Sequence, residues 1–191
     1  LPVIMEVSGH GVLLFNALAR VLIEADLLDR EYLEQRTEGL AALRDFLGAT
    51  DLAEAARETG VPLELLRAAA LAIGQAALGS NGRCLFVTGL GLSELTQGTD
   101  SVMALCNLAM LTGSIGKSGG GMLPLRGQNN VQGNADMGGM PDRLTGYQRL
   151  DDPVVQARVA ALWGWSVPPT VGLRIPEMFD AALAGTVRGL W

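Results

Sequence analysis

Cysteine, histidine and aromatic residues are scarce in this chain of 191 residues, which has two cysteines, one histidine and 5% aromatic residues. Cys84 and Cys106 stand far apart, with no Cys-x-x-Cys pair and no neighbouring histidine. The spacing therefore predicts neither a disulfide framework nor a zinc or iron–sulfur site. His10 is the lone histidine, and because a metal site needs several ligands we interpret it as structural or incidental. We expect no metal-ligating residue in the chain.

Runs of positive charge and long apolar stretches are also missing. The 14 Lys and Arg residues form no run, and 20 Asp and Glu residues bring the net charge to −6. Nucleic-acid binding depends on clustered positive charge, so we exclude this class of partner. Asn16 and Gln75 interrupt the apolar stretches at residues 11–19 and 68–78, which stay shorter than the roughly 18 residues of a membrane span. We expect a soluble, cytoplasmic protein, and a periplasmic location stays open because the sequence does not cover a signal region.

Glycine, in contrast, is abundant. It supplies 25 of the 191 residues, about 13%, against roughly 7% in ordinary proteins. Hydrophobic residues make up 49% of the chain. This composition favours an α/β protein with many tight turns. The chain begins with Leu1 and ends at Trp191 within an apolar segment, so we expect it to be an internal piece of a longer protein.

Short apolar segments alternate with helical patterns along the chain. Strands are predicted at residues 1–7, 84–88 and 187–191, and helices at residues 11–25, 29–35, 39–47, 51–58, 62–78, 100–111, 152–163 and 175–184. This alternation predicts an α/β fold with a doubly wound, mostly parallel sheet and flanking helices. We divide the chain into residues 1–80, a strand followed by a mainly helical part, and residues 81–191, an α/β part with a glycine turn. Both are expected to form one compact piece.

A glycine turn follows the strand predicted at residues 84–88. Gly89, Leu90 and Gly91 would let a ligand approach backbone N–H groups at the carboxyl edge of a sheet. The nicotinamide fingerprint needs glycine where Glu94 stands, and a carboxylate there repels a pyrophosphate. Three interpretations stay open: a standard NAD site, a structural turn, and a nucleotide loop of another kind.

Residues 126–136 carry seven polar side chains, among them Gln128 and Asn129, with Arg126 as the one positive charge. Amides offer both donors and acceptors. Burying one without a partner costs roughly 1–3 kcal/mol, so the segment needs a polar ligand, a backbone network or water. A bicyclic heterocycle with N–H and C=O edges would satisfy it. Arg126 could grip a carboxylate or phosphate through two parallel hydrogen bonds, or form an ordinary surface ion pair.

Several long stretches resemble the catalytic subunits of formate dehydrogenases. They are LAMLTGSIGK at residues 108–117, PLRGQNNVQG at 124–133, DMG at 136–138 and GYQ at 146–148. The flanks at residues 14–26, 36–39 and 176–191 are similar to the neighbouring parts of the same subunits. The resemblance covers nearly the whole chain, weakly at residues 40–67 and strongly at residues 82–148.

The resemblance implies a Rossmann-like molybdopterin-dinucleotide-binding domain of a larger subunit. That subunit would hold a molybdenum or tungsten ion between two molybdopterin guanine dinucleotides (bis-MGD) and oxidise formate to carbon dioxide. A 4Fe-4S cluster outside this chain would relay electrons to partner subunits. The family's metal-ligating Cys or selenocysteine, its catalytic His and its cluster cysteines have no counterpart here. We expect them upstream in the rest of the same subunit, and we expect the chain alone to be inactive.

The resemblance also assigns roles to single residues. Arg126 matches the active-site arginine that orients the substrate carboxylate. The cofactor-binding residues implied are Gly89, Leu90, Gly91 and Glu94 in the glycine turn and Gln128 and Asn129 in the cofactor-lining loop. Two departures stand out, since the family often carries an amide in place of Glu94, and residues 8–11 replace a turn similar to Pro-Gly-Thr-Asp. Two alternatives stay open: another molybdopterin oxidoreductase, such as an assimilatory nitrate reductase, or a non-catalytic remnant domain.

Overall fold

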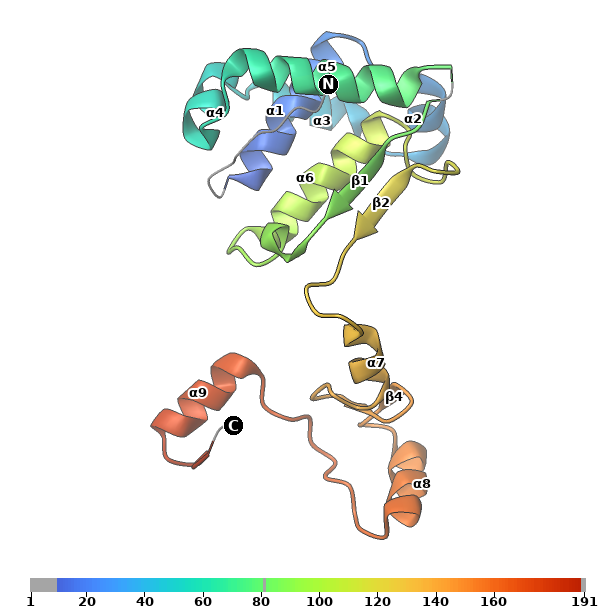
Figure 1. Cartoon of the computed structure of the whole chain (residues 1–191), viewed down its shortest axis with the longest axis vertical. Coiled ribbons are helices and arrows are strands. Elements are labelled where there is room, and N and C mark those ends of the chain that lie inside the picture. The colour runs from blue at the N-terminus through green and yellow to red at the C-terminus, as the bar shows by residue number, and fades with distance from the viewer. Residues whose placement is uncertain (1–9, 81, 190–191) are drawn as a thin grey trace. The chain divides into compact units, whose positions relative to one another are not determined.

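The computed structural model describes residues 10–80 and 82–189. The predicted strand at residues 1–7 lies outside the described residues. The chain divides into two compact units, one ending at Gly127 and one beginning at Gln128 (Figure 1). The helical part predicted for residues 1–80 therefore shares its unit with the parallel strands, while the part predicted for residues 81–191 extends over both units.

Five helices open the first unit, each within two residues of its predicted bounds. They are α1 (Gly11–Glu24), α2 (Arg30–Arg36), α3 (Leu40–Gly48), α4 (Leu52–Thr59) and α5 (Leu63–Leu78). Side-chain caps explain two of the starts. Asp29 accepts a hydrogen bond from the Tyr32 amide at 3.0 Å, and Asp51 accepts one from the Ala53 amide at 2.8 Å. Gly60, with φ of +72°, ends α4.

Helix α1 is the central helix of the first unit. Leu14, Leu18, Val21 and Leu22 recur at the spacing of one helix face and are buried. This face packs against α5 and against α6 (Gly98–Leu111), and Figure 1 shows α1 lying among these helices. The core of the unit is therefore mainly helical, as the periodicity of the sequence predicts.

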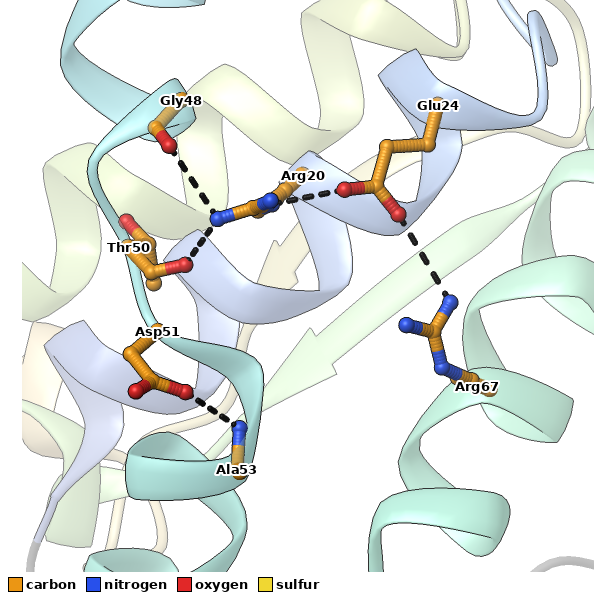
Figure 2. A network of polar contacts seen from close by, with 7 residues as sticks. All are labelled: Arg20, Glu24, Gly48, Thr50, Asp51, Ala53 and Arg67. Atoms are coloured by element: carbon orange, nitrogen blue, oxygen red, sulfur yellow. Dashed lines mark hydrogen bonds and ion pairs between the residues drawn. The ribbon is translucent and has the colours of Figure 1, made fainter.

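A polar network fastens α1 to its neighbours (Figure 2). Nε of Arg20 donates to Glu24 at 2.7 Å, and Nη1 donates to the carbonyl of Gly48 at 3.1 Å and to that of Thr50. The other oxygen of Glu24 lies 3.6 Å from Nη1 of Arg67 on α5. One guanidinium thus joins α1 to the connection between α3 and α4.

Two parallel strands complete the first unit. β1 (Leu85–Thr88) pairs with β2 (Gly121–Pro124), and α6 is the crossover between them. Phe86 and Met122 pack against the helical core, while Leu85, Val87 and Leu123 on the opposite face are exposed. β1 was predicted; β2 was not, because the sequence reads there as the end of a flexible turn. The α/β class is confirmed, and a doubly wound sheet stays a prediction.

The second unit is built from short elements. These are α7 (Val131–Asp136), β3 (Arg143–Leu144), β4 (Gln148–Arg149), α8 (Pro153–Trp163) and α9 (Ile175–Leu183). β3 and β4 are antiparallel, and a small core gathers Leu144, Leu150, Val159 and Val167. The two helices predicted here, at residues 152–163 and 175–184, are confirmed.

The strand predicted at residues 187–191 is wrong for residues 187–189, which lie in no strand. Gly185 has a φ of +74° just after α9, and this left-handed turn folds the chain back on the helix end. The amides of Thr186 and Val187 both donate to the carbonyl of Ala181, at 2.9 and 3.1 Å. These donors close the helix and are not free for a strand ladder. Residues 190 and 191 lie outside the described residues.

Within residues 10–80 and 82–189, no single helix is long and apolar enough to cross a membrane. Helices α4 and α5 meet that test only when they are taken together, and the chain bends by 104° between them.

Candidate functional site

The predicted site residues of the first unit lie where its two parallel strands end. Thr88 at the end of β1 stands opposite Pro124 at the end of β2. Figure 1 shows the two strands side by side. The amide of Leu125 then donates to the carbonyl of Thr88 at 2.7 Å. Ligands of parallel sheets bind outside the carboxyl ends of the strands. We call residues 89–94 the first edge loop and residues 125–127 the second edge loop.

The first edge loop is a closed turn. It contains the 3-10 turn η1 (Leu90–Leu92), and the carbonyl of Leu90 accepts hydrogen bonds from the amides of Ser93 and Glu94 at 2.9 and 3.1 Å. The Ser93 hydroxyl donates to the same carbonyl at 3.1 Å. The carboxylate of Glu94 is exposed at the end of this turn.

Gly89 and Gly91 are glycines that the fold itself does not require. Neither has a positive φ, and a Cβ built on either would meet no atom of the described residues within 4 Å. Glycine is needed for a left-handed backbone or for a close approach by another group. The space in front of these two positions is open, so a ligand that approaches the backbone here would explain both glycines.

Arg126 lies in the second edge loop. It is exposed, and among the residues that the structure describes no ion pair engages its guanidinium. The neighbouring Gly127 touches the first edge loop, because a Cβ on Gly127 would overlap with Cδ1 of Leu90 and lie 3.5 Å from its Cγ. The structure thus places the backbone next to Arg126 in contact with Leu90 of the first edge loop.

Gln128 and Asn129 belong to the second unit. Both are exposed, and they precede α7, whose first turn follows Asn130 in a left-handed conformation with φ of +56°. The side-chain amide of Asn134, farther along α7, donates from its nitrogen to the backbone carbonyl of Gly139 at 3.5 Å. Part of the amide-rich segment thus bonds to its own backbone, and cofactor binding by Gln128 and Asn129 stays a prediction.

The two thiols of the first unit lie away from the edge loops, Cys84 directly before β1 and Cys106 within α6. Cys106 on α6 places its sulfur 3.5 Å from the sulfur of Met122. Burial raises the pKa of the Cys84 thiol, which disfavours the thiolate that a metal would bind. Among the described residues, no three His, Cys, Asp or Glu side chains gather into a metal site.

Sequence reasoning missed Thr88, Leu125 and Gly127, which join the two edge loops. Their role depends on the pairing of β1 with β2, and β2 was not predicted. The one signal in the sequence was Gly127 itself, since glycine allows another group to approach the backbone closely.

No protein-family model matches this chain. It is 41% identical over 91% of its length to the F420-dependent formate dehydrogenase subunit alpha of Methanocaldococcus jannaschii. It is 37% identical over 96% of its length to formate dehydrogenase H of Escherichia coli, and 29% identical over 96% to the assimilatory nitrate reductase catalytic subunit of Bacillus subtilis. The chain spans 25% of the length of each of these relatives. Over nearly its whole length, the chain is therefore homologous to a segment of formate dehydrogenase alpha subunits.

Proposed function

We propose that this chain is part of the alpha subunit of a molybdopterin-dependent formate dehydrogenase, and that the whole subunit oxidises formate to carbon dioxide. The observation that carries the proposal is Arg126, an exposed arginine without an ion-pair partner among the described residues, at the carboxyl edge of a parallel strand pair. The relatives at 37% and 41% identity are named formate dehydrogenases, which supports formate as the substrate.

Two features of the edge loops bear on the binding of a pterin dinucleotide, the open space at Gly89 and Gly91, which favours it, and the negative charge of Glu94, which disfavours phosphates nearby. The open space at Gly89 and Gly91 would admit the cofactor against the backbone of the first edge loop, and Gln128 and Asn129 would offer amides to the pterin or guanine edges. The exposed carboxylate of Glu94 would repel a phosphate, so we place the phosphates away from it. Oxidation of formate to carbon dioxide releases two electrons and a proton, and a bound molybdenum or tungsten centre would supply the two-electron redox chemistry, with an iron–sulfur cluster and partner subunits as the onward acceptors.

Arg126 would bind and orient the substrate. Formate is a carboxylate, and a planar guanidinium grips a carboxylate through two parallel charge-assisted hydrogen bonds. Because the second edge loop is fastened to β1 and to Leu90, the backbone from which Arg126 projects would be held in place. The chain alone is expected to be inactive, since the metal and cluster ligands would come from the rest of the subunit.

We also propose that the parallel pair belongs to a larger, doubly wound sheet of the Rossmann-like type. Parallel sheets are normally covered by helices on both faces. Here Phe86 and Met122 on one face pack against the helical core, while Leu85, Val87 and Leu123 on the other face are 48%, 53% and 45% exposed. A structure of the whole subunit with this face open to solvent would contradict the proposal.

Substitution of Arg126 in the whole subunit tests the function. Arg126→Lys keeps the positive charge but loses the planar guanidinium that donates two parallel hydrogen bonds. The kcat/KM for formate should therefore fall roughly tenfold or more, which corresponds to about 1.4 kcal/mol of lost transition-state stabilisation. Arg126→Ala should fall further. Arg57→Lys is the control, because Arg57 lies on α4 and pairs only with Glu54 and Glu58 among the described residues. Near-normal formate oxidation with normal cofactor content in both Arg126 variants would overturn the assignment.

Nitrate reduction is the second candidate, because one relative with 29% identity is named an assimilatory nitrate reductase. Nitrate is also a planar anion that a guanidinium can bind with two hydrogen bonds. The purified subunit should reduce a dye with formate and should not oxidise a reduced dye with nitrate. The reverse result would favour this second candidate.

A further inference from the structure

Arg126 stands between two attachment points of the second edge loop. On one side, the Leu125 amide donates to the Thr88 carbonyl at 2.7 Å. On the other side, Gly127 lies under the side chain of Leu90. The backbone at residues 125 and 126 belongs to no helix or strand, and among residues 10–80 and 82–127 these two contacts hold it in place.

Among the residues that the structure describes, the contact at Gly127 is made by the side chain of Leu90. A Cβ on Gly127 would meet only Cδ1 and Cγ of Leu90 within 4 Å. Gly127 does not have a positive φ, so its backbone conformation is open to any residue. A side chain at position 127 would therefore force Cδ1 of Leu90 to move from the space that it occupies.

Leu90 is itself held in place. It is half-buried, and its carbonyl accepts hydrogen bonds from the amides of Ser93 and Glu94 and from the Ser93 hydroxyl. These bonds close the turn on which Leu90 sits. The contact of this leucine with Gly127 therefore gives the second edge loop a defined position, which a flexible polar contact would not.

We propose that Leu90 is a positioning residue for Arg126, in addition to lying in the predicted cofactor loop. Its side chain on Gly127 and the bond between Leu125 and Thr88 together fix the backbone from which Arg126 projects. The inference rests on the proposed function, in which Arg126 binds the substrate carboxylate. A catalytic group that is held before the substrate arrives avoids an ordering cost on binding, and small misplacements of such groups lower rates strongly.

The test is a double-mutant cycle in the whole subunit with its cofactor. Leu90→Ala removes the side chain that contacts Gly127, and Gly127→Ala places a methyl group where Cδ1 of Leu90 lies. Each variant should raise the KM for formate and lower kcat/KM by about tenfold per bound cofactor. In Leu90→Ala/Gly127→Ala the new methyl group fills the vacated space, so most of the loss should be recovered.

Leu92→Ala is the matched control on the same turn. The side chain of Leu92 lies near Gly11 at the start of α1, and it is not among the described atoms within 4 Å of a Cβ on Gly127. Leu92→Ala/Gly127→Ala should therefore show no recovery. Recovery with Leu92→Ala, or its absence with Leu90→Ala, would overturn the inference.

Hydrogen exchange of a peptide covering residues 125–127 gives a readout that does not depend on turnover. Exchange at the Leu125 amide should be faster in both single variants and should slow again in the double variant with Leu90→Ala. If the Arg126 variants stay active while this exchange pattern is observed, the proposed function is wrong, but the contact of Leu90 with Gly127 still holds the second edge loop. If Arg126→Lys loses turnover while Leu90→Ala changes neither exchange nor KM, the positioning role fails and the function stands.

Discussion

The ammonium of Lys117 lies 2.7 Å from the carboxylate of Asp29, and this ion pair joins the start of α2 to the loop between α6 and β2. The other oxygen of Asp29 caps α2 through the Tyr32 amide, and the Asp29 amide donates to the carbonyl of Leu111 at 3.0 Å. One aspartate thus connects segments that lie 88 residues apart in the sequence.

Lys117→Met should lower stability at neutral pH and change its dependence on acid. Burial raises the pKa of Asp29, but the hydrogen bonds from Lys117 and from the Tyr32 amide and the charge of Lys117 outweigh it, so the pKa lies below its ordinary value of 3.8. A lowered pKa stabilises the fold above the ordinary value, and this contribution is lost as the pH falls through the lowered pKa. At pH 7 the free energy of unfolding of the variant should be about 0.5–1 kcal/mol lower than that of the parent. As the pH falls below about 4, the free energy of unfolding should decrease less in the variant than in the parent.

Arg30→Met is the control for this ion pair. Arg30 contacts Asp26 at 2.5 Å, but the two side chains are 67% and 61% exposed, against 37% and 19% for Lys117 and Asp29. Solvent screening should leave no measurable loss at this pair. Urea unfolding at pH 7 and pH 3 measures both variants. Equal losses for Lys117→Met and Arg30→Met would contradict the role of Asp29 as a junction.

Gly113→Ala should destabilise the first unit more than Gly116→Ala. Both glycines have positive φ, +59° and +84°, so an alanine costs roughly 1 kcal/mol at either position. A Cβ on Gly113 would also overlap with the Asp29 carboxylate, whereas one on Gly116 would meet no described atom within 4 Å. Thermal unfolding should show an additional loss of about 1–3 kcal/mol for Gly113→Ala. A similar loss for both would mean that Asp29 moves aside freely.

Ser101→Ala should leave stability unchanged or raise it slightly. Ser101 is 1% exposed on α6, and among the described residues its hydroxyl has no hydrogen-bond partner. Removing a buried polar group without a partner removes its desolvation cost, for a gain of up to about 1 kcal/mol. A clear loss in urea unfolding would show that the hydroxyl has a partner in solution.

Thr112→Val is the contrasting change. The hydroxyl of Thr112 is equally buried, but it contacts the carbonyls of Leu108 and Ala109 at 3.1 Å and the Ser114 hydroxyl at 2.8 Å. A near-isosteric valine would leave Ser114 without this partner. The expected loss is roughly 1–3 kcal/mol in the same urea experiment.

The helices could be predicted because their signals are local. Asp29 and Asp51 cap the helices that follow them, and apolar residues recur at helical spacing on α1. β2 has only four residues, including a glycine and a proline, and its strand character comes from pairing with β1. The prediction at residues 187–191 failed for the opposite reason, because local hydrogen bonds to Ala181 overrode an apolar composition.

Candidate site residues could be proposed from the sequence, and their roles stay predictions, whereas their arrangement in space could not be predicted. Arg126, Gly89 and Gly91 stand out by residue type and by resemblance. The contact of Leu90 with Gly127 depends on the strand register that sets Thr88 beside Pro124. Because β2 was not predicted from the sequence, this register could not be predicted either.

The network around Arg20 in Figure 2 supports a final prediction, that Arg20→Lys lowers stability by about 1–2 kcal/mol. Arg20 donates to the Glu24 carboxylate and to the carbonyls of Gly48 and Thr50. The carbonyl of Gly48 lies at the end of α3, where helix carbonyls have no partner within the helix. A lysine ammonium is a single point charge without the planar fork, so it cannot keep all three contacts.

Arg67→Lys provides the comparison on the same carboxylate. Arg67 reaches Glu24 with one contact of 3.6 Å and is 41% exposed, whereas the Arg20 side chain is 28% exposed. A single exposed ion pair contributes about 0–0.5 kcal/mol, and lysine can replace it. Urea unfolding of both variants at 0.1 M and 1 M salt separates the two roles. The loss from Arg20→Lys should persist at high salt, because the carbonyl bonds are short-range and not screened as an exposed ion pair is. If salt abolished that loss, the pairing with Glu24 would be the whole contribution of Arg20, and the carbonyl bonds to the α3–α4 connection would add nothing.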